Sequence, residues 1–182
     1  MQITRAALGQ MAGEQPLPGL EQIFVTHKDL VFRAAYRITG SASDAEDVLQ
    51  TVFLRLAGQQ NFSAIGNLKA YLHRSAVNAS LDLLRGRKDA QTVQLDQETG
   101  GFEPASSEIA GRTIELRDWL RQALARLNPR WAEMFVLRFV EDYSNREIAG
   151  MMKTSSAVVA VVLHRTRAQL KRDFLAQTRG RR

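Results

Sequence analysis

The sequence predicts an all-α fold in which two small helical domains, each with a modest core, are joined by a flexible linker. Apolar residues recur at helical spacing over residues 21–88 and again over 113–176. Between these segments lies AQTVQLDQETGGFEPASSEIAG, which carries a Gly pair, a proline and a Ser pair and has no sustained helical period. No stretch alternates apolar and polar residues for long enough to form a strand, so we expect no strands.

Charge divides the chain at nearly the same boundaries. Residues 1–88 hold 10 basic and 7 acidic side chains (+3), residues 89–115 hold 1 and 6 (−5), and residues 116–182 hold 14 and 6 (+8), which gives the net charge of +6. Two basic domains around an acidic linker suit a polyanionic partner, either nucleic acid or an anionic membrane surface. A solvated basic surface without a partner is the alternative.

Composition also excludes several classes of protein. The chain has no cysteine, which rules out disulfides, thiol catalysis and cysteine-based zinc sites. No apolar run approaches the roughly 20 residues that span a bilayer, and the N-terminus lacks a signal-peptide pattern. We therefore expect a cytoplasmic protein.

Its expected parts are a flexible N-terminal extension (1–20), a first helical domain (21–88), an acidic linker (89–112) and a second helical domain (113–176).

In the first domain, a capping box at Ser43–Glu46 predicts the start of a helix with the sequence DAEDVLQTVFLRL. Its apolar positions form one core stripe, made of Val48, Leu49, Val52, Phe53 and Leu56. Asp44, Glu46 and Asp47 lie in the first turn, where the helix dipole favours acidic groups. Cap chemistry alone accounts for these acids.

A second helix is predicted over residues 67–87, NLKAYLHRSAVNASLDLLRGR, and it carries two apolar stripes. The first stripe is Leu68, Leu72, Ala76, Ala79 and Leu83, and the second is Val77, Leu81 and Leu84. Between them runs a polar seam, which we define as Tyr71, Arg74, Asn78, Asp82 and Arg85. Such a set suits an unstacked base or a distorted duplex, because a ring can stack, an amide can bind a base edge and arginine can hold phosphate. The alternative is an ordinary solvated face with an Asp–Arg pair.

In the second domain, the pattern predicts a helix-turn-helix. Asn128-Pro129 favours a helix start, and a capping box at Ser144–Glu147 favours a second, short helix. A turn at 153–155 then leads into a longer helix, the recognition helix of the motif, which would enter the major groove. Its expected core arc is Val158, Val159, Val162, Leu163, Thr166 and Leu170. Its expected outer arc is Ser156, Ala157, Ala160, Val161, His164, Arg167 and Lys171.

Together these segments resemble a bacterial sigma factor of the extracytoplasmic function (ECF) group of the sigma-70 family, over roughly residues 25–88 and 113–172. DAEDVLQTVFLRL is similar to the family's core-polymerase-binding helix, and NLKAYLHRSAVNASLDLLRGRK to its −10 recognition segment. LARLNPRWAEMFVLRFVEDYSNREIAGMM and LHRTRAQL are similar to its −35-binding domain. Tyr71 stands where the family usually has Trp, whereas Asn78, Asp82 and Arg85 stand in their expected places.

The resemblance implies a factor that directs core RNA polymerase to promoters and assists melting, and that is not itself an enzyme. Implied partners are core polymerase, promoter DNA and an anti-sigma factor, with no small-molecule substrate, cofactor or metal. The implied polymerase-binding residues are Asp44, Glu46, Asp47, Gln50, Thr51 and Leu54. The implied −10 residues are Tyr71, Arg74, Asn78, Asp82, Arg85, Arg87 and Lys88, with a base pocket formed by the loop 61–67 and the helix after it. The implied −35 residues are Arg146, Ser155, Ser156, Ala157, Ala160, Val161, His164, Arg165, Arg167 and Lys171.

The recognition helix departs from the family pattern. Val158, Ala160, Val161 and Val162 stand where the family usually has Thr, Lys or Arg, Ser and Arg. With no Arg, Asn or Gln early in the helix for bidentate base contacts, we expect weak or unusual −35 specificity that relies on thymine methyls, serine hydroxyls and duplex shape.

A sigma-like protein that sequesters an anti-sigma factor is the main alternative, and a simple helix-turn-helix repressor is another. An enzyme is disfavoured, because there is no Gly-rich phosphate loop, metal cluster or nucleophile–base pair.

Overall fold

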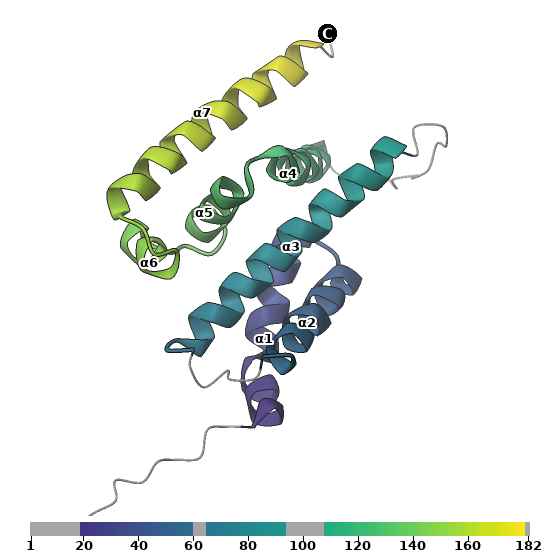
Figure 1. The fold of residues 1–182 in the computed structure, drawn as a ribbon. Helices are drawn as coiled ribbons and strands as arrows, with labels where there is room; N and C mark the ends of the chain where they lie inside the picture. The colour runs from purple at the N-terminus through teal and green to yellow at the C-terminus, as the bar shows by residue number, and fades with distance from the viewer. Residues whose placement is uncertain (1–18, 60–64, 94–107, 181–182) are drawn as a thin grey trace, which may run out of the picture.

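The computed structural model describes residues 19–59, 65–93 and 108–180. Within them the regular structure is entirely helical, which confirms the expected all-α class (Figure 1). The helices are α1 (Leu20–Thr39), α2 (Ala42–Ala57), α3 (Leu68–Val93), α4 (Glu108–Arg126), α5 (Pro129–Phe139), α6 (Asn145–Met151) and α7 (Ser156–Gly180). The expected N-terminal extension lies outside the described residues up to position 18, as do residues 61–64 of the expected base pocket.

The first domain is formed by α1, α2 and the first half of α3. Its core consists mainly of the apolar stripe of α2 and the first stripe of α3, packed on Ile23, Val31, Ala34 and Ala35 of α1. The predicted start of α2 is wrong by two positions. The N-cap is Ser41, whose Oγ accepts the Asp44 N–H at 3.3 Å. The reason is Gly40, which ends α1 in a left-handed conformation (φ 74°) and lets the chain begin a new helix at once.

The expected linker is helical at both of its ends. Helix α3 continues to Val93, and α4 already begins at Glu108. Lys, Asp, Ala and Gln at positions 88–91 continue α3, and none of them stops a helix as Gly or Pro would. The Gly pair and the proline of the linker lie outside the described residues.

The second domain contains α4 to α7 and confirms the predicted helix-turn-helix. Asn128 caps α5 by accepting the Arg130 N–H at 3.0 Å, with Pro129 in the first turn. The capping box of α6 is complete, since Ser144 and Glu147 each bind the other's backbone N–H. The turn into α7 passes through Lys153 at φ 50°.

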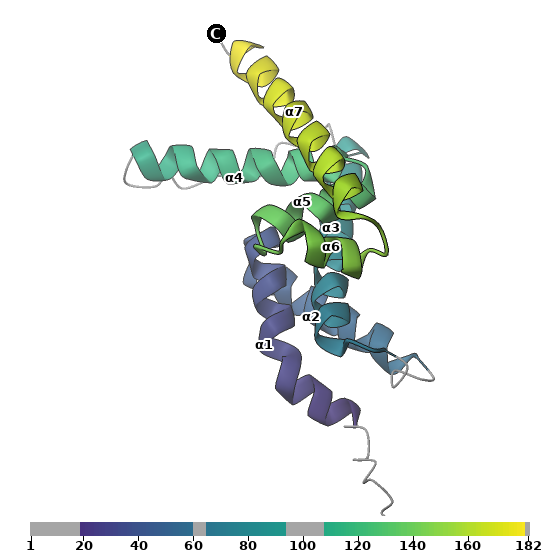
Figure 2. The ribbon, with the colours of Figure 1, turned by 90° about the vertical axis from the view of Figure 1, so that its left-hand side faces the viewer.

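The core of the second domain includes residues of the first domain. The second stripe of α3 (Val77, Leu81 and Leu84) belongs to the same apolar cluster as residues of α4 to α7. Figure 1 shows α3 between the α1–α2 pair and the second domain, and Figure 2 shows α5 and α6 above the first domain in the turned view. The first apolar stripe of α3 therefore packs against α1 and α2, and the second packs against the second domain.

Candidate nucleic-acid and polymerase interfaces

The polar seam of α3 lies between the two domains. Its five residues are half-buried except Asp82, which is exposed. The Tyr71 hydroxyl accepts a hydrogen bond from Gln59 Nε2 at 2.6 Å, which ties the ring to the segment just after α2. Arg85 Nη1 donates to Asp82 at 2.9 Å. The seam thus exists as expected, and it also contains the Asp–Arg pair of the alternative interpretation.

Two seam residues bind the second domain. Arg74 Nε and Asn78 Nδ2 both donate to one carboxylate oxygen, Glu133 Oε1 on α5, and the Asn78 contact measures 3.1 Å. Arg74 Nη1 also donates to the Met151 carbonyl at 3.1 Å. Glu133 is well buried, with 7% of its side chain exposed. Sequence reasoning missed this residue. The signal for it was the second apolar stripe of α3, which requires another element to pack against it.

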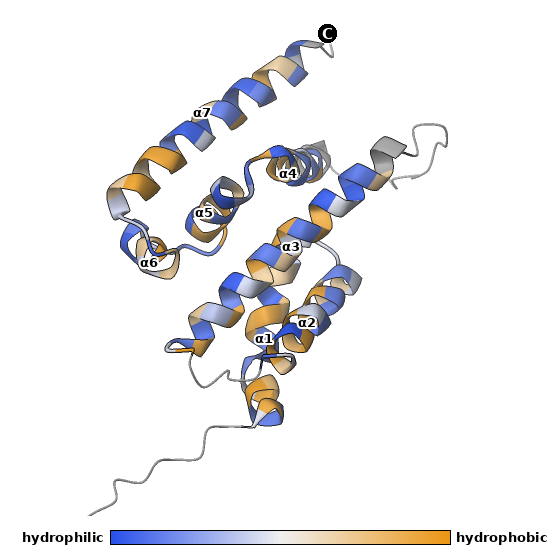
Figure 3. Cartoon of the chain, viewed as in Figure 1, coloured by the Kyte–Doolittle hydropathy of each residue, from blue (hydrophilic) through white to orange (hydrophobic). Residues whose placement is uncertain are grey.

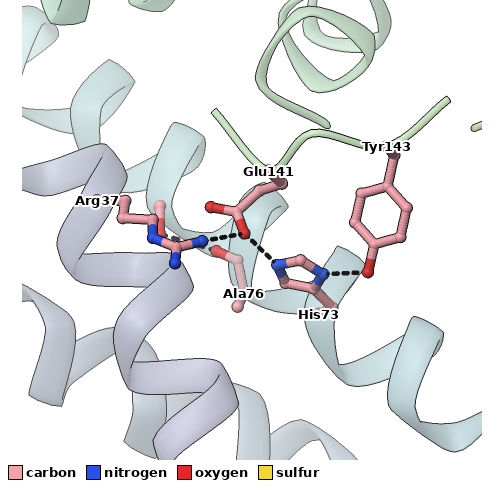
Figure 4. Close-up of polar contacts among 6 residues, drawn as sticks. Arg37, His73, Ala76, Glu141 and Tyr143 are labelled. Atoms are coloured by element: carbon pink, nitrogen blue, oxygen red, sulfur yellow. Dashed lines mark hydrogen bonds and ion pairs between the residues drawn. The ribbon is translucent and has the colours of Figure 1, made fainter. Parts of the chain in front are cut away.

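A second polar cluster joins the domains beside the first (Figure 4). Glu141 Oε2 lies 2.7 Å from His73 Nε2 and 3.1 Å from Arg37 Nη1. His73 Nδ1 lies 2.6 Å from the Tyr143 hydroxyl. A carboxylate can only accept, so His73 Nε2 carries a proton toward Glu141. Burial raises the pKa of Tyr143, and the nearby Glu141 and Glu147 carboxylates raise it further.

The outer face of α2 is open to a partner. Glu46, Asp47 and Gln50 are exposed, and Thr51 is half-buried with its hydroxyl on the Asp47 carbonyl at 2.8 Å. Leu54 is the most exposed large apolar side chain of the described residues, at 72%. An exposed leucine on an acidic helix face is suited to a protein partner with a basic rim.

Asp44 and Arg87, which are expected at two different interfaces, bind each other. Asp44 is buried at the start of α2 and forms an ion pair with Arg87 of α3. The pair holds the two helices together. Arg87 keeps about half of its side chain exposed, and Lys88 beside it is exposed. Asp44 is the one expected polymerase contact that this fold encloses.

The outer arc of α7 is exposed as predicted. All seven of its residues are exposed, as are Arg146, Ser155 and Arg165. Ser155 Oγ accepts the Val158 N–H at 3.2 Å and so caps the helix. Val158 is 47% exposed, so its expected place in the core is wrong. The buried stripe of α7 is narrower than the predicted arc: it consists of Val159, Leu163, Thr166 and Leu170, and Val158 lies beside it on the helix. Figure 3 shows that this apolar start of α7 gives way to a more hydrophilic second half.

The described residues offer no group of three or more His, Asp or Glu side chains arranged to hold a metal ion. None of the described helices has the length and apolar character needed to cross a membrane.

Comparison with known proteins identifies the family. The chain matches the model of sigma-70 region 2 over residues 23–90 and that of sigma-70 region 4 over residues 117–170. It is 32% identical over 178 residues to the ECF RNA polymerase sigma factor SigE of Mycolicibacterium smegmatis, covering 96% of this chain and 68% of that relative. The chain belongs to the ECF sigma factors of the sigma-70 family.

The chain is also similar to other sigma factors. The sigma factor is 30% identical to the RNA polymerase sigma-E factor of Streptomyces coelicolor, covering 85% or more of both chains. It spans 52% of the length of SigG from Mycobacterium tuberculosis. Among solved structures, RpoE from Bartonella quintana, in complex with the anti-sigma factor NepR, matches 84% of this chain with a TM-score of 0.48 and 21% identity. Sigma factors act in transcription initiation and are not enzymes.

Proposed function

We propose that this sigma factor uses three separate surfaces: the outer face of α2 for core RNA polymerase, the polar seam for the −10 element and the outer arc of α7 for the −35 element. The observation that carries the proposal is the exposed outer arc of α7, a basic and uncovered helix face in a helix-turn-helix. An anti-sigma partner stays a prediction of the family resemblance.

Leu54 tests the polymerase surface. Placing a charge on this exposed leucine would remove its apolar contact and add like charge to an acidic face. We expect Leu54→Glu to abolish co-elution with core polymerase in gel filtration. Leu175→Glu is the matched control, because Leu175 is an exposed leucine near the end of α7. Equal retention of both variants would contradict the assignment of α2.

The polar seam is tested by run-off transcription with core polymerase. Asn78 and Arg85 supply an amide for a base edge and a guanidinium for phosphate. We expect replacement of both by alanine to abolish open-complex formation while polymerase binding persists. Lys69→Ala is the control, since Lys69 is an exposed cation of α3 outside the seam. If the unaltered chain binds polymerase but starts no transcript, the alternative of a sigma-like sequestering protein is favoured.

The apolar start of α7 is the basis for an unusual −35 contact. Ala160 and Val161 are exposed and can meet thymine methyls, but they cannot form the bidentate hydrogen bonds that read guanine or adenine. We expect Ala160→Lys with Val161→Ser to change the preferred −35 sequence in transcription from a promoter library. An unchanged preference would contradict direct contact by these residues.

A further inference from the structure

We propose that Gln59 is a positioning residue for −10 recognition, whose side chain holds the Tyr71 ring where an unstacked base can stack on it. This inference rests on the proposed role of the seam in −10 binding. Gln59 lies outside the seam, just after α2, and its Nε2 donates to the Tyr71 hydroxyl at 2.6 Å. The one aromatic ring of the seam is therefore held by a residue from outside α3.

The Gln59 side chain starts from a fixed backbone. The Gln59 N–H donates to the Leu56 carbonyl at 3.0 Å, which bonds the residue to the last turn of α2. Leu56 is fully buried in the core of the first domain. A short, hydrogen-bonded segment therefore connects the amide on Tyr71 to that core.

The Tyr71 backbone is fixed in the same way. Tyr71 lies in the first turn of α3, and its N–H donates to the Asn67 carbonyl at 3.0 Å. Its side chain is half-buried and packs against the core of the first domain. The remaining motion that displaces the whole ring is rotation about χ1, and a hydrogen bond at the hydroxyl, the atom farthest from the backbone, restricts it.

The size of the effect follows from the populations of the ring orientations. Without the Gln59 bond, the ring spends less time in the orientation that receives a base, and the apparent affinity for the unpaired strand falls by the same factor. One net hydrogen bond shifts such a population about fivefold. We therefore expect a partial loss of −10 binding when the bond is removed.

The first test is a double-mutant cycle in the formation of open complexes by core polymerase loaded with the full chain, on a promoter selected from the library. Gln59→Met keeps the length of the side chain and removes the amide, whereas Tyr71→Phe keeps the ring and removes the hydroxyl. We expect each variant to lower the equilibrium constant about fivefold. The double variant should lower it no further, because either change already breaks the bond. A loss of about 25-fold in the double variant, the product of two independent effects, would overturn the proposal.

The second test reports stacking on the ring directly. One adenine of the −10 element at a time is replaced by 2-aminopurine, whose fluorescence is quenched when it stacks. The template carries a mismatched −10 element, so the strand is already unpaired with every variant. We expect one position to be quenched with the unaltered chain and to be brighter with Gln59→Met. Equal fluorescence of the two at every position would contradict the positioning role.

Two substitutions on α1 serve as matched controls. Gln22→Met removes an exposed glutamine amide, and Tyr36→Phe removes the hydroxyl of an exposed tyrosine, both in the same domain. We expect neither to change open-complex formation. Gln59→Met and Tyr71→Phe should still co-elute with core polymerase in gel filtration, and loss of co-elution would refute a role confined to the −10 element.

The tests separate this inference from the proposed function. If replacement of Asn78 and Arg85 by alanine leaves open-complex formation unchanged, the seam does not bind the −10 element and the proposed function fails. If that double replacement abolishes open complexes but Gln59→Met behaves like Gln22→Met, the positioning role of Gln59 fails alone.

Discussion

Truncation of Leu81 tests whether α3 belongs to both cores. Leu81 is fully buried in the cluster shared with the second domain. A buried Leu→Ala change costs about 2–5 kcal/mol. For 182 residues unfolding as one unit, the entropy of unfolding is about 0.4 kcal/mol/K, so a loss of about 3 kcal/mol lowers Tm by about 8 °C. If the domains unfolded independently, fewer residues would unfold in each transition and its entropy of unfolding would be smaller. The same loss of stability would then lower the Tm of one transition by more than about 8 °C and leave the other unchanged.

Hydrogen exchange locates the effect of Leu81→Ala. We expect faster exchange in α5 and α6 as well as in α3, because the removed side chain supports the contact between them. Leu72→Ala is the control, since Leu72 is equally buried but belongs to the core of the first domain. It should accelerate exchange in α1 and α2. Unchanged exchange of α5 and α6 in Leu81→Ala would refute a shared core.

Two further substitutions test local structure. Ser144→Ala should cost about 1 kcal/mol in urea unfolding, as expected for a lost Ser N-cap. Hydrogen bonds from Ser144 lower the pKa of Glu147, so this stabilisation is complete at neutral pH and is lost as the pH falls below the ordinary glutamate range. If Ser144→Ala costs the same free energy of unfolding at neutral and at acidic pH, this explanation is wrong. Gly40→Ala should lower Tm, because Gly40 has φ 74° and an added Cβ would overlap the Arg121 guanidinium. Gly150→Ala, in an open helical position, should not lower it.

The sequence predicted the parts of this fold that depend on local chemistry. The capping groups at Asn128 and Ser144 are where the pattern placed them. The outer arc of α7 is exposed as expected, because helical periodicity fixes which side chains share a face. The error at Ser43 arose because two serines lie near the start of α2, and only the position of Gly40 decides between them.

The relation between the domains was not predictable in the same way. Periodicity showed that α3 has two apolar stripes, but a stripe does not specify what covers it. Glu133 and Glu141 were missed because each is an ordinary glutamate in its local sequence, and its partners lie at least 55 residues earlier in the chain. Polar contacts over such separations depend on the packed arrangement and not on any local spacing.

The position of the seam explains why it can be covered at all. On one helix, the polar seam lies directly beside a stripe that must be buried, so any element that buries Val77 and Leu81 comes within reach of Arg74 and Asn78. Covering these donors with apolar atoms would leave a cation and an amide without partners, which is costly. The carboxylate at position 133 avoids that cost, because one of its oxygens accepts from both donors.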